Sequence, residues 1–282
     1  MSIKTFIRSR SLSFYFILAY AISWGGFLLS FGPDGFQIFQ GESVLSQGFS
    51  ERQSFIVWLG MLAGPSLACL LLTGIVDGKP GLKRLVLSML KWNVNIKWYI
   101  AALFMTPTLL VLILYGLMFI SPDFSPGLLL GFGLAVGLIG GFFEEIGWTG
   151  FAQTKLQLYY SPLFAGIILG VIHAIWHFPA DYWGGISFYG EFYVLHFILW
   201  IIALIAFRLL SVWIYNRSNS LLLAQLTHAS FTGSQLVFWP PAVSSAESVF
   251  WYMIFTFALC IVVAIIVIKE KNSFIHNIRK SN

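Results

Sequence analysis

The sequence contains few charged residues and few cysteines. Only 10% of its 282 residues are charged, and its two cysteines, Cys69 and Cys260, lie in apolar stretches without the spacing of metal ligands. Hydrophobic residues instead make up 58% of the chain, and the mean hydropathy is +0.84. A soluble domain of this length cannot bury so much apolar surface. The composition therefore predicts an integral membrane protein in which the cysteines are small core residues.

The alternating segments typical of an outer-membrane β-barrel are also missing from the sequence. The apolar residues form longer runs, close to the ~20 residues that a helix needs to cross the hydrocarbon core. Such runs occur at 12–31, 55–76, 98–121, 127–155, 161–179, 193–214, 220–238 and 248–268. The predicted fold is all-α, a polytopic membrane bundle of about eight transmembrane helices.

The basic residues predict the orientation of these helices, because short cytoplasmic loops carry the excess of Lys and Arg. With the N-terminus inside, only Arg52 of the 16 basic residues lies outside, whereas acidic residues such as Asp181 and Glu191 lie outside. The basic residues assigned to the cytoplasmic side are Lys4, Arg8, Arg10, Lys79, Lys83, Arg84, Lys91, Lys97, Lys155, Arg208, Arg217, Lys269, Lys271, Arg279 and Lys280. We expect both termini in the cytoplasm and a bacterial cytoplasmic membrane as the location.

The basic residues form no long run, so the net charge of +5 indicates contact with membrane lipid and not with nucleic acid. Residues 80–92 are amphipathic at helical spacing and predict a helix in the cytoplasmic interface. Because no linker or repeat divides the chain, we expect one structural domain. Its regions are the N-terminal helices with the interfacial helix (1–126), a core with the polar motifs (127–237), and the last helix with a basic tail (238–282).

Two adjacent carboxylates, Glu144 and Glu145, lie in the apolar stretch GGFFEEIGWTGFAQ. Each would cost about 2.5–3.5 kcal/mol if it were ionised at mid-membrane without a partner. Successive residues of a helix point about 100° apart, so one carboxylate can face a cavity while the other bonds a neighbouring helix. The pair is either a hydrogen-bonded link between helices or part of a functional site.

Three histidines lie on two later apolar runs. His173 and His177 are four residues apart in HAIWHFP, so they lie on one face of a helix, about 6 Å from each other, and can share a metal ion or a water. His228, in LTHASFT, has Gln225 about one turn before it and Thr232 one turn after it. We expect the three helices to converge so that their polar residues satisfy one another in lipid, and two carboxylates with three imidazoles can then activate a water molecule.

The order of EEIGWTG, HAIWHFP and LTHASFT resembles that of the CPBP family of intramembrane proteases, which includes the CAAX prenyl proteases and the Abi bacteriocin-immunity proteins. The resemblance covers residues 127–237 and implies an eight-helix endopeptidase that cleaves membrane-associated proteins or peptides. The motif EExxxR falls on Glu144, Glu145 and Thr149, FxxxH on His173 and His177, and HxxxN or HxxxD on His228 and Thr232.

The resemblance also assigns roles to these residues. It implies that Glu144 and His177 activate the attacking water, and that His228 and the residue at position 232 stabilise the oxyanion. Glu144, His177 and His228 could hold a zinc ion and leave one ligand position open. Without a metal, the same residues can act as base and hydrogen-bond donors, so the sequence leaves the cofactor open between zinc and none.

Three positions depart from the family motifs: Thr149 replaces Arg, His173 replaces Phe, and Thr232 replaces Asn or Asp. Each change keeps or adds a polar group, which indicates a site with altered chemistry more than a site that has lost its activity. Without Arg at position 149 fewer cations offset burial, so we expect a raised pKa for Glu144 as the general base. Glu145 is expected to bond a neighbouring helix and to hold Glu144 in place.

The depth of the motif residues raises a geometric problem. If 127–155 and 161–179 are antiparallel spans, Glu144 and His177 fall at different depths in the membrane. A helix break at Gly140–Gly141, or a later start of the fifth span, would remove the mismatch. Two consecutive glycines directly before the carboxylates favour the break.

Two other classes of protein fit part of this pattern. Intramembrane Glu and His can form the proton relay of a transporter, although the sequence contains no evident inverted repeat. A catalytically weak scaffold or immunity protein would use the polar cluster for packing. Prenylated CAAX tails, bacteriocins and other membrane proteins are all open as substrates. Of the remaining histidines, His196 is interpreted as an interfacial or packing residue, and His276 lies in the tail.

Overall fold

The computed structural model describes residues 3–31 and 51–275, and its regular secondary structure in these ranges is helical, without a strand. The long helices are α2 (Ser11–Phe31), α3 (Glu51–Val76), α5 (Ile96–Leu117), α6 (Leu130–Gly147), α8 (Pro162–Tyr189), α9 (Tyr193–Ser218), α10 (Leu221–Val237) and α11 (Ser245–Lys269). The shorter ones are α1 (Ile3–Ser9), α4 (Gly78–Met89), α7 (Thr154–Leu156) and α12 (Lys271–Ile275). The all-α prediction is confirmed for the described residues, and Asp34, Glu42, His276, Arg279 and Lys280 lie outside them.

Six stretches of the described residues are long and apolar enough to cross a membrane, so the chain is an integral membrane protein. They are Ser11–Ser30, Phe55–Val76, Ile96–Leu117, Leu130–Leu156, Pro162–Ser218 and Ser245–Lys269. The fifth stretch contains both α8 and α9, and α10 is helical but only 17 residues long. Each of the eight predicted runs is therefore helical, whereas the number of candidate spanning stretches is six and not eight.

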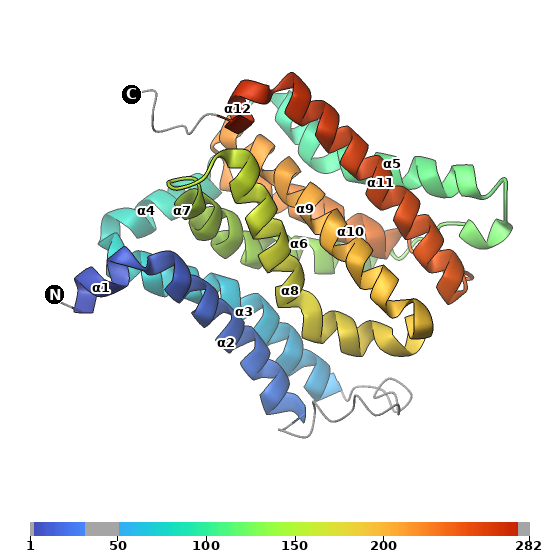
Figure 1. Cartoon of the computed structure of the whole chain (residues 1–282), viewed down its shortest axis with the longest axis horizontal. Helices are drawn as coiled ribbons and strands as arrows, with labels where there is room; N and C mark the ends of the chain where they lie inside the picture. The colour runs from blue at the N-terminus through green and yellow to red at the C-terminus, as the bar shows by residue number, and fades with distance from the viewer. Residues whose placement is uncertain (1–2, 32–50, 276–282) are drawn as a thin grey trace.

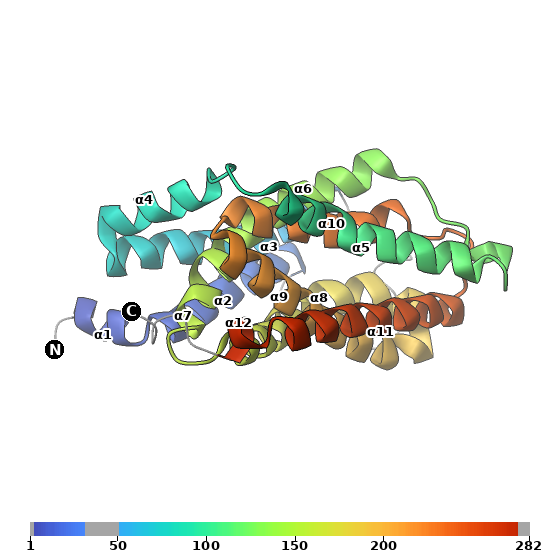
Figure 2. The same ribbon diagram turned by 90° about the horizontal axis from the view of Figure 1, so that it is seen from above.

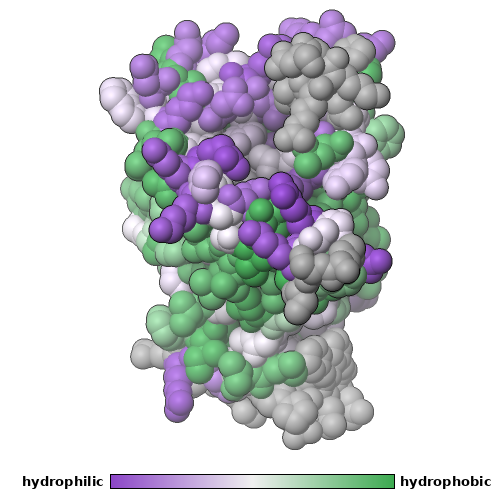
Figure 3. Space-filling model, turned by 90° about the vertical axis from the view of Figure 1, so that its left-hand side faces the viewer, coloured by the Kyte–Doolittle hydropathy of each residue, from purple (hydrophilic) through white to green (hydrophobic). Residues whose placement is uncertain are grey.

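The long helices lie side by side, which gives the molecule two ends (Figure 1, Figure 2). The short helices α1, α4, α7 and α12 gather toward the left of both views. They contain Lys4, Arg8, Lys79, Lys83, Arg84, Lys155 and Lys271. Figure 3 faces this side and shows hydrophilic side chains gathered above a band of hydrophobic ones. Two statements stay predictions: this end faces the cytoplasm, and α4 lies in the membrane interface.

One charged residue does not follow the predicted topology. Arg208 was assigned to the cytoplasmic side, but it lies inside α9 and is 0% exposed. The assignment is wrong because this arginine has a carboxylate partner within the bundle, so it does not need to reach water.

The helices α6 and α10 approach each other along a row of glycines. Gly133, Gly137 and Gly141 of α6 face the backbone of α10 around Ala229 and Gly233. Small residues of this kind let membrane helices pack closely. The predicted break at Gly140–Gly141 is wrong: α6 continues through both glycines to Gly147, and Gly141 contacts the backbone of α10 instead.

The depths of the motif residues agree because α8 is longer than the predicted run 161–179, while the stretch that carries Glu144 ends where the sequence indicated. After Gly147 the chain remains helical, through a π-helix at Trp148–Gln153, to Leu156, twelve residues beyond Glu144. The helix α8 starts at Pro162, eleven residues before His173, and continues past Pro179 to Tyr189. At a rise of about 1.5 Å per residue these positions lie at similar depth.

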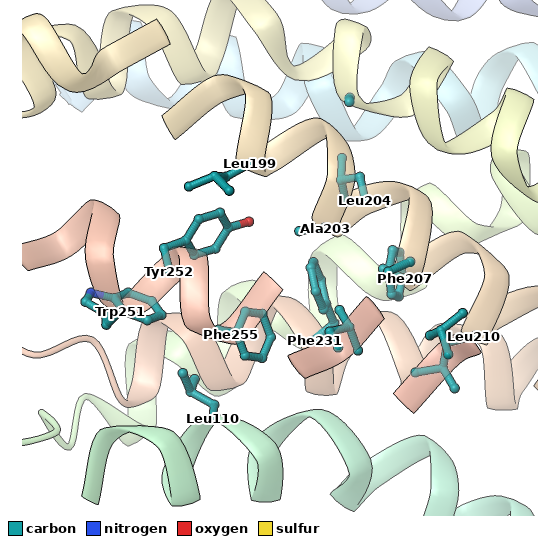
Figure 4. Packing of buried hydrophobic residues seen from close by; sticks show 14 of the residues in the cluster. Leu110, Leu199, Ala203, Leu204, Phe207, Leu210, Phe231, Trp251, Tyr252 and Phe255 are labelled. Atoms are coloured by element: carbon teal, nitrogen blue, oxygen red, sulfur yellow. The ribbon is translucent and has the colours of Figure 1, made fainter. Parts of the chain in front are cut away.

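The largest apolar core lies between α5, α9, α10 and α11 (Figure 4). Leu110 of α5, Phe207 of α9, Phe231 of α10 and Phe255 of α11 are each at most 1% exposed. The rings of Phe207 and Phe231 stack with centroids 4.5 Å apart. This packing holds α9 beside α10, the two helices that carry Arg208 and His228.

The glycine contact leads to a first prediction. Gly141→Ala should lower the free energy of unfolding by about 1–3 kcal/mol, because overpacking forces the helices apart. A β-carbon at Gly141 would lie 2.5 Å from the carbonyl oxygen of Gln225 and 2.8 Å from the backbone nitrogen of Ala229. Gly131→Ala, on the same helix with no atom within 4 Å, is the matched control. Unfolding in detergent measures both, and equal stabilities would contradict the prediction.

Candidate active site

Three helices bring the motif carboxylates and imidazoles together. Glu144 comes from α6, His173 and His177 from α8, and His228 from α10. The Oε2 atom of Glu144 lies 3.1 Å from Nε2 of His173, 4.0 Å from Nε2 of His177 and 3.8 Å from Nε2 of His228. The predicted convergence of the three motif helices is confirmed. One carboxylate oxygen, in a side chain that is only 8% exposed, is surrounded by three imidazoles.

The neighbouring carboxylate, Glu145, is fully buried and forms an ion pair with Arg208 of α9. Arg208 donates through Nη2 to Oε1 and through Nη1 to Oε2, the latter at 3.1 Å. The Thr149 hydroxyl donates to Oε2 at 2.5 Å, and Nδ1 of His228 lies 2.7 Å from Oε1. Glu145 therefore bonds two neighbouring helices, α9 and α10, as the sequence predicted.

Arg208 supplies a cation that the sequence analysis did not find. The motif EExxxR would place this cation at position 149, where this chain has Thr. The guanidinium comes from α9 instead, while Thr149 adds a hydroxyl to the same carboxylate. A single arginine in the middle of an apolar run was the signal, since intramembrane charges pair with one another. The pKa expected for Glu144 stays a prediction.

His228 connects the two carboxylates. A carboxylate only accepts hydrogen bonds, so Nδ1 of His228 donates to Glu145 and Nε2 of the neutral ring is left as an acceptor. This Nε2 faces Glu144 at 3.8 Å. Glu145 thereby fixes the tautomer and the orientation of the imidazole, while Glu144 stays on the side of the other histidines.

The backbone widens into the π-helix Trp148–Gln153 directly after the carboxylates. Such segments are rare and frequently occur at functional sites. Here Trp148 packs against His173 with ring centroids 4.9 Å apart, and Thr149 faces Glu145. The sequence did not predict this π-helix. It contributes one contact to Glu145, through Thr149, and one to His173, the partner of Glu144, through Trp148.

A cavity of about 360 Å³ opens onto the cluster. Its polar lining residues are Glu144, His173, His177, His228 and Thr232. Phe27 of α2 and Met61 of α3 belong to an apolar wall opposite them. Gln225 is not in the lining, because its side chain donates to the carbonyl oxygen of Phe142 at 3.0 Å and joins α10 to α6. The cavity therefore combines a polar base with walls suited to an apolar substrate.

Two polar residues that the sequence analysis did not connect with the site lie next to it. Asp181, which was assigned to the outside, belongs to α8, and its side chain is 16% exposed. His196, which was interpreted as interfacial or packing, lies in α9 with its Nε2 at 3.4 Å from Asp181. Asp181 follows His177 by one helical turn, and this spacing was the signal in the sequence.

Glu144, His173 and His177 each offer one metal-ligand atom, and these atoms lie within 4.8 Å of one another. Imidazole nitrogens and a carboxylate oxygen are ligands that suit zinc. The group contains His173, whereas the sequence predicts His228 as the third ligand. Nε2 of His228 is 3.8 Å from Glu144 and can serve as a further metal ligand. The bond from His228 to Glu145 is the outer contact that metal-binding imidazoles usually make. The donor set therefore fits a zinc-like ion.

The same segment of the chain is similar to known proteins. Residues 125–234 match the family model described as "Type II CAAX prenyl endopeptidase Rce1-like". A stretch of 59 residues is 42% identical to a protein named "CAAX prenyl protease 2" from Methanococcus maripaludis. That alignment covers 21% of this chain and 20% of the relative, so it spans about a fifth of each protein. The family match includes all the converging residues, Glu144, Glu145, His173, His177, Arg208 and His228.

The buried ion pair leads to a second prediction. Arg208→Met should lower the free energy of unfolding by about 3–5 kcal/mol, because it leaves the carboxylate of Glu145 buried without its cation. Adding Glu145→Gln should recover most of this loss, since no unpaired charge then remains. The exposed pair Arg217–Glu270 offers a control, and Arg217→Met should cost about 0–1 kcal/mol. Equal losses from Arg208→Met and Arg217→Met, measured by unfolding in detergent, would contradict the prediction.

The donor set leads to a third prediction. Purified protein titrated with Zn²⁺ should bind the ion, and His173→Phe should weaken this binding at least about 10-fold by removing one ligand. Metal content by mass spectrometry and competition with a chromophoric chelator measure the affinity. His196→Phe removes a histidine outside the group and should leave the affinity unchanged. If His173→Phe binds Zn²⁺ as tightly as the unchanged chain, the ligand assignment is wrong.

Proposed function

We propose that this chain, whose residues 125–234 form a domain of the Rce1-like type II CAAX prenyl endopeptidase family, is an intramembrane endopeptidase. The observation that carries the proposal is the convergence of Glu144, His177 and His228 on the wall of one cavity inside the membrane bundle. Proteins or peptides at the membrane would be the substrates, with lipid around the helices. The proposal does not extend to prenylated tails, because nothing in the described cavity singles out a prenyl group.

The first chemical step is the activation of water. Nε2 of His177 and Oε2 of Glu144 are 4.0 Å apart, a separation that one water molecule can bridge. Glu144 takes a proton from this water while the water oxygen attacks the carbonyl carbon of the scissile peptide bond. The same carboxyl then returns the proton to the leaving amine, which breaks the carbon–nitrogen bond. His173, 3.1 Å from Glu144, holds the carboxyl in place.

The second requirement is stabilisation of the oxyanion that forms on the carbonyl oxygen. Thr232 lies one turn after His228, lines the same cavity and has a hydroxyl that can donate. A doubly protonated imidazole of His228 would also donate from Nε2, since its Nδ1 already donates to Glu145. A divalent ion bound by Glu144, His173 and His177 would add Lewis acidity at this position.

The division of roles between the carboxylates supports this mechanism. Glu145 has four contacts, with Arg208 twice, Thr149 and His228, and is 0% exposed. A carboxylate with its lone pairs engaged in this way cannot reach a substrate. Glu144 lies within hydrogen-bond distance of His173, faces the imidazoles of His177 and His228, and lines the cavity, so it is the one able to exchange protons with water.

This asymmetry gives a fourth prediction. Glu144→Gln should abolish peptide hydrolysis, because an amide cannot accept the proton, and should leave the thermal stability close to that of the unchanged chain. Glu145→Gln should mainly lower stability, because it leaves Arg208 buried without a carboxylate. Cleavage of a peptide library by purified protein in detergent, followed by mass spectrometry, measures the first effect. Thermal unfolding measures the second.

The outcomes separate an enzyme from a scaffold. Cleavage that is lost in Glu144→Gln supports the proposed function. Cleavage that survives Glu144→Gln would show that another residue is the base, and no cleavage by the unchanged chain would favour the non-catalytic alternative. Complete loss of activity from both substitutions without any change in stability would show that the two roles are wrongly divided.

A further inference from the structure

A second cavity adjoins the catalytic one. Its volume is about 330 Å³, and it shares Ala180, Gly184, Trp200 and Thr232 with the cavity that contains Glu144. It lies further along α8, toward the end opposite α1 and α4 (Figure 1). A substrate that occupies the first cavity can therefore extend into the second.

One carboxylate provides the charge of this second cavity. Of the described residues that line it, Asp181 is the only one with a formally charged side chain. Its Oδ2 accepts from the hydroxyl of Tyr193 at 3.0 Å, and its Oδ1 lies 3.4 Å from Nε2 of His196. A carboxylate can accept about four hydrogen bonds, so part of its capacity is free. Negative charge without a cation in an apolar bundle favours a cationic ligand.

The other polar groups point to the same chemistry. Because Nε2 of His196 donates to Asp181, Nδ1 of the neutral ring is an acceptor, and it has no protein partner among the described residues. The hydroxyl of Tyr252, which can also accept, is buried and likewise has no partner in the described part of the chain. His196 and Tyr252 are 6% and 3% exposed. Of the buried lining atoms without a protein partner in the described part of the chain, these two can accept, while Nε1 of Trp200 at the boundary of the cavities is a donor.

The walls of the cavity are aromatic. Tyr189 stacks on His196 with ring centroids 3.8 Å apart, and Tyr252 lies 5.4 Å from the same imidazole. Trp200 and Trp239 also belong to the lining, and Figure 4 shows Tyr252 beside Leu199 of α9. Aromatic faces attract cations and also cover the apolar stem of a lysine or arginine.

We propose that this second cavity is a substrate subsite that binds a lysine or arginine side chain, with Asp181 as its counter-ion. The inference rests on the proposed function, because it assigns a specificity to the same catalytic site. Asp181 lies one helical turn beyond His177, or about 6 Å along α8. An extended peptide covers about 3.3–3.6 Å per residue, so the basic side chain lies about two residues from the scissile bond.

The test uses two matched sets of peptides and the full chain in detergent. The first set consists of acetylated and amidated nonapeptides of leucine and alanine with one lysine, placed at each position in turn. The second set carries Nε-acetyl-lysine at the same positions. Acetylation keeps the aliphatic chain of the lysine and removes its charge. Cleavage positions and rates are read by mass spectrometry. We expect kcat/KM to be about 10- to 1,000-fold higher for lysine at one position close to the cleaved bond.

Three variants locate the effect. Asp181→Asn should remove the preference for lysine over acetyl-lysine, whereas Asp181→Glu, which keeps the charge, should retain it. Glu191→Gln removes an exposed carboxylate near the same end of α8 and should change the preference by less than about threefold. Thermal unfolding of each variant shows whether it folds. The comparison between the two peptide sets on the unchanged chain tests the proposal even if Asp181→Asn does not fold.

Binding of the same peptides to Glu144→Gln separates the subsite from the proposed function. Cleavage without any preference for lysine, or a preference that survives in folded Asp181→Asn, would overturn the subsite while the endopeptidase stands. Lysine-dependent binding without cleavage by the unchanged chain would overturn the endopeptidase while the subsite stands. If neither cleavage nor lysine-dependent binding occurs, Asp181 serves only to join α8 to α9, and both proposals fail.

Discussion

The buried ion pair between Glu145 and Arg208 is the contact on which the arrangement of the site depends. In an apolar bundle neither charge is tolerated alone, so the folded chain must keep α6 and α9 joined through this pair. The same carboxylate also accepts from Nδ1 of His228 and joins α10 to this group. Because Glu145 carries these structural contacts, Glu144 is left to face the cavity and the imidazoles of α8.

This electrostatic link works only at short range, and the backbone provides the necessary closeness. The glycines of α6 let the backbone of α10 approach directly, which brings His228 within hydrogen-bond distance of Glu145. The π-helix that follows places Trp148 against His173 and Thr149 against Glu145. Apolar packing of Phe207 against Phe231 then keeps α9 and α10 in register. Charge, close approach and packing therefore stabilise one arrangement.

The helix α8 connects the two cavities. His173, His177 and Asp181 follow one another at intervals of four residues, so one face of this helix carries a polar group in each turn. The first two face Glu144, and the third faces His196 of α9. The boundary between the cavities is formed by residues that line both, among them Trp200 and Thr232. A peptide in an extended conformation would contact the cluster around Glu144 and Asp181 at the same time.

The sequence by itself determined the membrane class, the all-α fold and the three motifs whose helices converge, because long apolar runs and four-residue spacing follow from the geometry of a single helix. It could not determine contacts between helices. The role of Arg208 depends on how α9 is rotated against α6, and the glycines before Glu144 favoured a break in the sequence because the contact of Gly141 with α10 is visible only in the folded chain. The pairing of Asp181 with His196 was hidden for the same reason, since the two residues lie on different helices. These features depend on how the helices are rotated and on how closely they approach, and only the tertiary structure fixes both.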